Sequence, residues 1–350
     1  MTDSAHRHSH HAPIRVRQKG RHLVVDIHAH LNVAAAETTI RQVMPGLPKG
    51  LPFSCPASDA VNARMFAAIG SKLNGVADRL ADMDRLGVDV QALSPNPGQY
   101  YYFAPPELGR ELARTINDGI AEAVAAAPER LVGIGTVPLQ DVGMAIEEMH
   151  RAVRDCGMRG IEIGTNVGGR DLAAEQFRPF FAAAEELGIL LFLHPLGFTQ
   201  GERLSDHYFN NLIGNPLEST IAISHLIFGG VLDAYPGLKI CVAHGGGYLP
   251  AYRGRMDHAY YAREDCRQHI ARAPSSYLNQ LWFDSLVFDR AQLDQLVATY
   301  GADRICLGSD YPFDMAEPDP VGFVDHLGGA AKPQVLGLNA ARLLGLQAAA

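Results

Sequence analysis

Residues 23–30 read LVVDIHAH, an apolar, β-branched run that ends in two histidines separated by one residue. Such a run predicts a buried β-strand. Side chains two apart in a strand point to the same face, so His28 and His30 are expected to lie side by side. An open doubly wound sheet usually has a glycine-rich turn after its first strand, and none follows this one. The stretch therefore favours a closed barrel over an open sheet.

Further strands and helices alternate along the rest of the chain. Short apolar runs predict strands at 90–95, 131–138, 160–165, 189–195, 239–244, 281–286 and 304–310. Amphipathic stretches predict helices at 76–86, 106–126, 142–155, 175–187, 217–234, 290–300 and 333–344, with one more within 250–274. Eight strands, nearly all followed by a helix, predict an α/β fold of the (β/α)₈ TIM-barrel type.

Two segments are additional to the minimal barrel, which we assign to residues 22–345. Residues 31–75 form a long insertion after the first strand, interrupted by proline and glycine, and are expected to cap the barrel as a lid. Residues 197–216 form a second long loop after the fifth strand. The polar, His-rich residues 1–21 are expected to be a disordered tail.

Composition and charge limit the class of protein. The chain has 350 residues, of which 47% are hydrophobic, and its formal net charge is −8 without a basic block, which argues against nucleic-acid binding. It contains no apolar run long enough for a membrane span and no apolar segment typical of a secretory signal. The five cysteines include no CxxC pair and are expected to be reduced thiols. We therefore expect a cytoplasmic protein.

Polar side chains end several of the predicted strands, where a barrel carries its chemistry. His194 and Asp310 each stand at such an end, after an apolar run. Together with the His28/His30 pair of the first strand they form a set of four candidate ligands. Three imidazoles and one carboxylate suit Zn²⁺, with Mn²⁺ as an alternative. The sequence therefore predicts a metal site of His28, His30, His194 and Asp310, and no organic cofactor.

Three more polar residues lie close to these strand ends. His244 precedes three glycines, which let backbone or substrate approach closely, and it is the candidate general base or acid. It could instead be a further ligand or only orient a water molecule. Glu162 and Asp284 are candidates for fixing the tautomer of a metal-bound histidine, although Glu162 could equally be satisfied within the barrel.

The motifs resemble the amidohydrolase superfamily, in the branch around 2-amino-3-carboxymuconate-6-semialdehyde decarboxylase. The similarity covers essentially residues 22–345 and rests on DIHAH at 26–30, FLHP at 192–195, CVAHGGG at 241–247 and LGSDYPF at 307–313. The resemblance implies a barrel with one catalytic zinc. It implies His28, His30, His194 and Asp310 as ligands and His244 as the catalytic histidine.

The resemblance also implies a homodimer. In the family, an arginine eleven residues after the catalytic histidine binds a substrate carboxylate in the neighbouring subunit, and Arg255 stands at that position here. A second carboxylate-binding arginine of the family is replaced by Ala67, with Arg64 and Lys72 as the nearest cations. We take Arg64 as the candidate replacement. Leu196 stands where the family has an aromatic residue, so the substrate pocket is expected to differ.

The predicted function is metal-dependent, nonoxidative decarboxylation of a small unsaturated or aromatic-derived carboxylic acid. The alternative is a hydrolase or hydratase of a ring-cleavage product or lactone, in which water activated by the metal attacks the substrate. The GSDYPF sequence at 308–313 resembles the decarboxylases, whereas hydratase relatives tend to have GSE. A barrel that binds metal or acids without turnover is a third possibility, disfavoured by the complete ligand set and His244.

Overall fold

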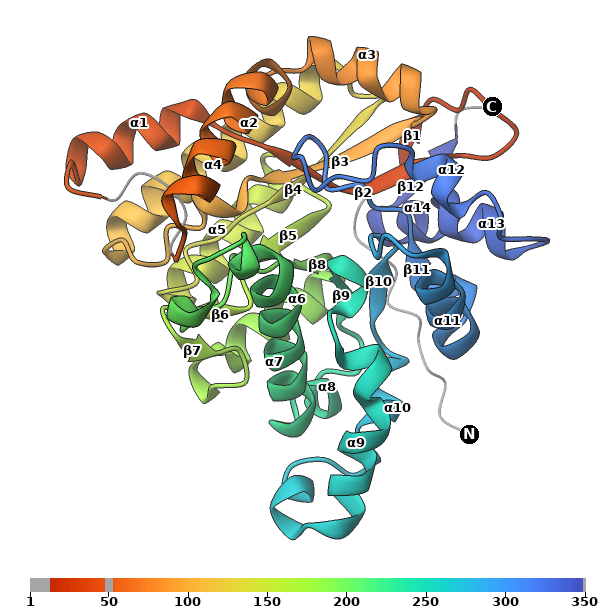
Figure 1. Cartoon of the computed structure of the whole chain (residues 1–350). Helices are drawn as coiled ribbons and strands as arrows, with labels where there is room; N and C mark the ends of the chain where they lie inside the picture. Colours follow the sequence, from red (N-terminus) through yellow and green to blue (C-terminus); the bar gives the residue numbers. More distant parts are fainter. Residues whose placement is uncertain (1–12, 48–52, 349–350) are drawn as a thin grey trace.

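The computed structural model describes residues 13–47 and 53–348, and its centre is a sheet of eight parallel strands (Figure 1). In spatial order these are β2 (Val25–Leu31), β3 (Val90–Pro95), β4 (Leu131–Gly135), β5 (Gly160–Ile163), β8 (Leu190–Leu193), β9 (Lys239–Val242), β10 (Trp282–Asp284) and β11 (Ile305–Cys306). The strands fall within or next to the predicted runs. Most are shorter than predicted, because the predicted runs extend past the sheet into the loops that follow.

The first and last strands close the sheet into a barrel. The Ile27 amide donates to the Leu307 carbonyl at 2.9 Å, and the Asp310 amide donates to the His28 carbonyl at 2.8 Å. Hydrogen bonds across this seam leave no free edge between β2 and the end of β11. The predicted (β/α)₈ barrel is therefore confirmed.

The strands are apolar along their length because both of their faces are covered. Every residue of β2 and β3 is buried, as expected for parallel strands between a barrel interior and an outer ring of helices. Ile27 and Phe192 belong to the inner core, which also contains the buried free thiols Cys241 and Cys306.

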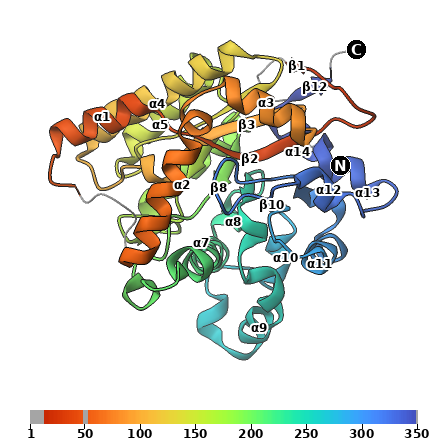
Figure 2. The same ribbon diagram turned by 45° about the horizontal axis from the view of Figure 1, so that its top comes forward.

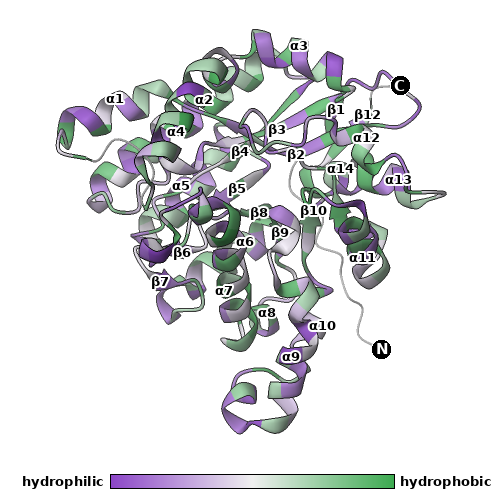
Figure 3. Ribbon diagram, viewed as in Figure 1, coloured by the Kyte–Doolittle hydropathy of each residue, from purple (hydrophilic) through white to green (hydrophobic). Residues whose placement is uncertain are grey.

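Amphipathic helices form the outer ring, and Figure 3 shows their hydrophobic and hydrophilic residues alternating along the ribbon. In α5 the apolar side of the helix buries Ala145 and Met149, and the Asp141 carboxylate caps its first turn by accepting from the Met144 amide at 2.9 Å. The helices that follow the first barrel strands are α3 (Ala77–Leu86), α4 (Pro106–Ala126), α5 (Val142–Arg154), α6 (Arg178–Leu187), α7 (Asn215–Phe228) and α8 (Val231–Ala234). The remaining ones are α9 (Leu249–Ala262), α10 (Ser275–Leu278), α11 (Arg290–Tyr300), α12 (Pro320–Val324), α13 (Ala331–Pro333) and α14 (Asn339–Leu344).

The insertion after the first strand contains two helices, α1 (Ala34–Val43) and α2 (Pro56–Asn74). Figures 1 and 2 both place α1 and α2 on the same side of the molecule. Phe66 of α2 meets Phe313 edge to face, with ring centroids 6.3 Å apart. Phe313 follows β11, so α2 lies over the loop that ends the last barrel strand. Residues 48–52, between the two helices, lie outside the described part of the chain.

The predicted disordered tail, residues 1–21, is wrong for residues 14–16. These form β1 (Ile14–Val16), which pairs in parallel with β12 (Leu346–Ala348). The pairing is stabilised because the Val16 side chain is fully buried in the inner core at the base of the barrel. The His-rich residues 1–12 lie outside the described residues.

Helix α9 has few contacts with the body of the protein. Only Leu249 of its residues is buried, while Tyr252 is 64% exposed. In Figure 1 the helix and the loop that follows it extend away from the strands. Among the described residues, no helix combines the length and the apolar character that a bilayer span requires.

Candidate metal centre

The four predicted ligands meet at one end of the barrel. His28, His30, His194 and Asp310 are all buried and offer ligand atoms within 4.8 Å of one another. His28 Nε2 lies 3.1 Å from His30 Nε2, and His30 Nε2 lies 3.1 Å from Asp310 Oδ1. The two histidines come from β2, His194 follows β8, and Asp310 follows β11. The structure therefore brings together side chains that are far apart in the sequence.

The rings of His28 and His30 are oriented by hydrogen bonds on their far sides. His28 Nδ1 donates to Asp284 Oδ2 at 2.7 Å, and His30 Nδ1 donates to the Pro95 carbonyl at 2.9 Å. A carbonyl oxygen only accepts, so the Nδ1 of His30 carries the hydrogen. This arrangement leaves the Nε2 lone pairs facing the cluster, as in metal-binding histidines.

His194 and Asp310 leave buried polar atoms unsatisfied. Neither ring nitrogen of His194 nor Oδ1 of Asp310 has a hydrogen-bond partner among the described residues. Buried polar atoms of this kind are normally paired, so their orphaned state at one point indicates a bound group. Burial lowers the pKa of His194 well below its usual value, and neighbouring histidines lower it further. The neutral ring therefore presents a lone pair.

The electrostatics of the cluster favour a positive charge. Burial alone would lower the pKa of His28, yet the charges of Asp310 and Asp284 outweigh it and raise that pKa to about 10. Burial alone would raise the pKa of Asp310, yet the adjacent His28 and other histidines hold it well below its usual range. Three nitrogen donors and one carboxylate fit a divalent transition metal. These four side chains form the metal site.

His244 lies beside the cluster on the side open to solvent. Its Nε2 is 3.7 Å from Asp310 Oδ2, and its side chain is 16% exposed, whereas those of His28 and His30 are fully buried. The residue has a positive φ of 56°, which is uncommon outside glycine. The next residue, Gly245, has no room for a side chain, since a Cβ there would lie 2.4 Å from Val287. The glycines after His244 thus allow close packing, as predicted.

Asp284 connects the metal site with the His244 loop. One carboxylate oxygen accepts from His28, and the other accepts from the Gly245 amide at 2.8 Å. Asp284 is fully buried, at the end of β10. A single side chain therefore orients both a ligand and the segment that carries His244.

Glu162 lies beside His30 without binding it. Its Oε1 accepts from the Tyr100 hydroxyl at 2.8 Å, and its Oε2 is 3.8 Å from His30 Nδ1 and has no hydrogen-bond partner in the described structure. Burial raises the pKa of Glu162, and this effect outweighs the opposing charge of His30. The same Tyr100 hydroxyl approaches the His194 carbonyl at 3.2 Å. Glu162 thus supports the strand ends that carry two ligands.

A buried polar network beneath the ligands was not predicted from the sequence. The Asp26 carboxylate accepts from the Ser309 hydroxyl at 2.6 Å, the Ser309 amide at 3.0 Å and Gln91 Nε2 at 2.9 Å. Arg79, which is fully buried, donates to Gln91 Oε1 at 2.6 Å and to the His30 carbonyl at 2.5 Å. The network joins the strand that bears His30 to the residue before Asp310. Arg79 lies in the polar sequence ADRLADMDRL, which gives no sign that this arginine is buried.

The two predicted substrate-binding arginines do not reach the cluster within one chain. Arg64 on α2 and Arg255 on α9 are exposed, and neither has a hydrogen bond or ion pair with any described residue. At about 100° per residue, Arg64 lies on the opposite side of α2 from Phe66, which faces the barrel. The other nearby cation, Lys72, is paired with Asp82 at 2.7 Å.

Comparison with known proteins gives one family and several similar chains. The amidohydrolase family model matches residues 25–346. A 2-amino-3-carboxymuconate-6-semialdehyde decarboxylase of Dictyostelium discoideum is 36% identical over 297 residues, which cover 84% of this chain and 83% of that one. A gamma-resorcylate decarboxylase of Rhizobium radiobacter is 30% identical over 254 residues, 67% of this chain and 76% of that one.

A solved structure of similar fold carries a metal and an aromatic acid. The 5-carboxyvanillate decarboxylase of Novosphingobium aromaticivorans, crystallised with manganese and 4-hydroxy-3-methoxy-5-nitrobenzoic acid, superimposes with a TM-score of 0.82 at 24% identity. The match covers 96% of this chain and 100% of the other. At this level of identity the similarity concerns the fold, and it agrees with the barrel described above.

Proposed function

The chain belongs to the amidohydrolase family, and from this membership we propose that it is a metal-dependent, nonoxidative decarboxylase of an unsaturated or aromatic-derived carboxylic acid. The observation that carries the proposal is the buried His28, His30, His194 and Asp310 cluster with His244 at its open side. The two relatives named above are decarboxylases, which favours loss of CO₂ over the alternative of hydrolysis or hydration. A cytoplasmic location stays a prediction.

We propose zinc as the resident metal, held by the four clustered side chains. Imidazole nitrogens and carboxylate oxygens are donors that suit zinc, and manganese is the alternative because it is bound in the related crystal structure. When bound, the divalent ion supplies a Lewis acid that polarises a substrate oxygen and stabilises negative charge there. Metal analysis of the purified protein distinguishes the two ions.

His244 is the proposed proton donor to carbon. Decarboxylation breaks the bond between the carboxylate carbon and its neighbour, the electron pair stays on the conjugated carbon, and a proton must then form the new C–H bond. His244 faces the cluster 3.7 Å from Asp310 and is partly exposed, so it can take up a proton from solvent and deliver it to a substrate in the mouth.

Asp284 and Glu162 are proposed as positioning residues. Asp284 fixes the ring of His28 and, through the Gly245 amide, the backbone next to His244. Glu162 accepts from Tyr100 beside His30 and His194. Both act through their neighbours, so we expect their replacement to lower the affinity for the metal without changing which reaction is catalysed.

Arg255 is proposed to bind the substrate carboxylate in the partner of a homodimer. It is exposed on a helix with a single buried residue, Leu249, and has no partner within the described chain. Exposed aromatic side chains accompany it, among them Tyr252 and Tyr261, which are 64% and 71% exposed. Large exposed aromatics of this kind are typical of interfaces. Arg64 stays a prediction for the same role from the cap.

Subunit mixing tests the assignment of Arg255. Homodimers of His244→Asn and of Arg255→Met are each expected to be inactive. If Arg255 acts on the partner, a hybrid of the two has one intact site, so random re-pairing restores about a quarter of wild-type activity. If both residues act in the same chain, every hybrid site carries a defect and no activity returns, which contradicts the proposal.

The overall function is tested by following products from a panel of ring-cleavage acids and hydroxybenzoates. The metal-loaded protein is expected to release CO₂ from at least one acid. His244→Asn should keep the metal content and lower kcat by about 10²–10⁴-fold. Addition of water without CO₂ release would favour the hydratase alternative, and full activity of His244→Asn would remove its role in proton transfer.

A further inference from the structure

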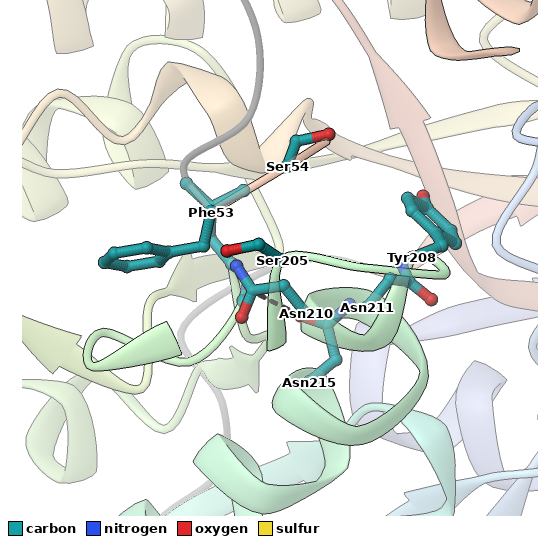
Figure 4. Close-up of a pocket in the computed structure, with 9 residues that line it drawn as sticks. Phe53, Ser54, Ser205, Tyr208, Asn210, Asn211 and Asn215 are labelled. Atoms are coloured by element: carbon teal, nitrogen blue, oxygen red, sulfur yellow. Dashed lines mark hydrogen bonds between the residues drawn. The ribbon is translucent and has the colours of Figure 1, made fainter. Parts of the chain in front are cut away.

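A pocket opens beside the metal site between the cap and the loop after β8. Figure 4 shows its wall coming from two segments, with Phe53 and Ser54 on one and Ser205 to Asn215 on the other. We call it the side pocket. It is lined by Phe53, Ser54, Leu196, Gly197, Ser205, Tyr208, Asn210, Asn211 and Asn215.

Asn210 fixes the shape of the side pocket. Its Oδ1 accepts from the Phe198 amide at 2.8 Å, and its side chain lies against the backbone of three glycines. A Cβ at Gly197 would lie 2.5 Å from the Asn210 amide, and one at Gly201 would lie 2.8 Å from it. Because a side chain at either position would displace Asn210, the wall of the pocket is closely packed around this asparagine.

Three other polar groups of the side pocket have no hydrogen-bond partner among the described residues. The Ser54 hydroxyl is buried without a hydrogen bond, and neither the Tyr208 hydroxyl nor the Asn211 side-chain amide has one to any residue in the described ranges. Phe53 and Tyr208 also have positive φ angles of 52° and 61°, which cost about 1–3 kcal/mol each in residues of this kind. Unpaired donors and acceptors on a strained wall are typical of a binding site.

The lining of the side pocket, as far as residues 13–47 and 53–348 form it, is polar and apolar without a charged side chain. Burial, together with the negative charges of Asp314 and Asp310, raises the pKa of Tyr208 to about 12, so its hydroxyl stays a neutral donor. No described lining residue offers a carboxylate a cation, whereas a neutral hydroxyl or carbonyl group needs none and can form hydrogen bonds with Tyr208, Asn211 or Ser54.

The side pocket is next to the reacting centre. Leu196 follows the ligand His194 by two residues, which places its Cα within about 8 Å of the ligand's Cα. The Tyr208 ring points away from Phe53 in Figure 4. A substrate held at the metal by one end can therefore reach the pocket with the other.

We propose that the side pocket binds the end of the substrate remote from the departing carboxylate and selects an uncharged hydrogen-bonding group there over a second carboxylate. Tyr208, Asn211 and Ser54 supply the donors and acceptors. The proposal rests on the proposed decarboxylase function. Within that function it assigns monocarboxylic acids with a neutral polar substituent as the preferred substrate class.

Binding of two matched acids tests the selection without turnover. The probes are 3-hydroxybenzoate and benzene-1,3-dicarboxylate, which differ in one ring substituent. Calorimetry on the metal-loaded protein should give a dissociation constant at least about tenfold lower for the hydroxy acid. Tyr208→Phe and Asn211→Ala should each reduce this preference, and Asn211→Arg should shift it towards the dicarboxylate.

The control is Asn279→Ala, an exposed asparagine at the end of α10, far from the pocket in the sequence. It should keep the wild-type preference, and thermal melting should confirm that all variants fold. Equal or tighter binding of the dicarboxylate by the wild type, or a preference unchanged by the pocket substitutions, overturns the proposal even if CO₂ release stands. Conversely, a preference that the substitutions abolish supports the pocket even if no acid is decarboxylated.

Discussion

At the metal site each ligand-bearing segment is fixed by buried hydrogen bonds, whereas several polar side chains of the side pocket have none. His28 is held by Asp284, and the backbone of His30 accepts a hydrogen bond from Arg79. In the pocket, the Ser54 hydroxyl and the Asn211 amide are without partners among the residues described. Internal hydrogen bonds thus fix the positions of the metal-binding side chains, whereas these polar groups of the pocket stay available to a ligand.

The largest effect should follow removal of the metal. Chelation is expected to lower kcat/KM by about 10³-fold or more, because the site loses its Lewis acid, and to lower the melting temperature, because bound metal stabilises the native state. Activity assays and calorimetry with and without added zinc or manganese measure both. His326→Ala, which removes a partly exposed histidine paired with Asp294, should respond to chelation as the wild type does. Unchanged activity after complete chelation would contradict a metal-dependent reaction.

Asp284→Asn should weaken metal binding by about 10–100-fold, because an amide orients His28 less firmly than a carboxylate does. Competition with a chromogenic chelator measures this affinity. The matched control is Asp294→Asn, since Asp294 also bonds a histidine, His326, but at the surface and at 2.8 Å. Equal affinities for the two variants would show that the buried aspartate has no special role at the metal.

Arg79→Met should lower the free energy of unfolding by about 3–5 kcal/mol, because it leaves Gln91 Oε1 and the His30 carbonyl without their buried cationic donor. Chemical denaturation measures the loss. Arg154→Met removes an exposed arginine paired with Asp155 and should leave the denaturation midpoint where it is. A midpoint for Arg79→Met equal to that of the control would show that the network below the ligands does not stabilise the fold.

The smallest effect is expected for two serines, Ser309 next to the metal ligand Asp310 and Ser54 in the side pocket. Ser309→Ala removes a hydroxyl that donates to Asp26 at 2.6 Å and should cost about 1–3 kcal/mol of unfolding free energy. Ser54→Ala removes a buried hydroxyl without a partner and should change that free energy by less than about 0.5 kcal/mol. The same denaturation experiment measures both. A larger loss of unfolding free energy for Ser54→Ala than for Ser309→Ala would contradict the described difference between the metal site and the pocket.

The sequence predicted the barrel and the metal cluster well because their signals are local. Each ligand follows an apolar run, and the carboxyl ends of parallel strands must meet at one rim, so His194 and Asp310 could be placed next to His28 without knowing any contact. The bounds of α4 and α11 agree with the predicted helices for the same reason, since their apolar periodicity is continuous.

The network and the side pocket could not be predicted because they depend on packing between distant segments. Arg79 is buried only because Gln91 and the His30 carbonyl accept its hydrogens, and neither partner is visible in the polar sequence of α3. The side pocket requires residue 53 to meet the loop at 205–215, which no periodic pattern encodes. β1 was missed because three residues are too few for a reliable strand signal.

The seam of the barrel has a consequence for how the protein is made. His28 and His30 leave the ribosome early, but Asp310 belongs to the opposite side of the seam, where its amide bonds the His28 carbonyl. A nascent chain, which emerges N-terminus first, therefore lacks a complete set of ligands until its last barrel strand has been synthesised. The complete ligand set therefore forms late in biogenesis, only in chains whose two ends have come together.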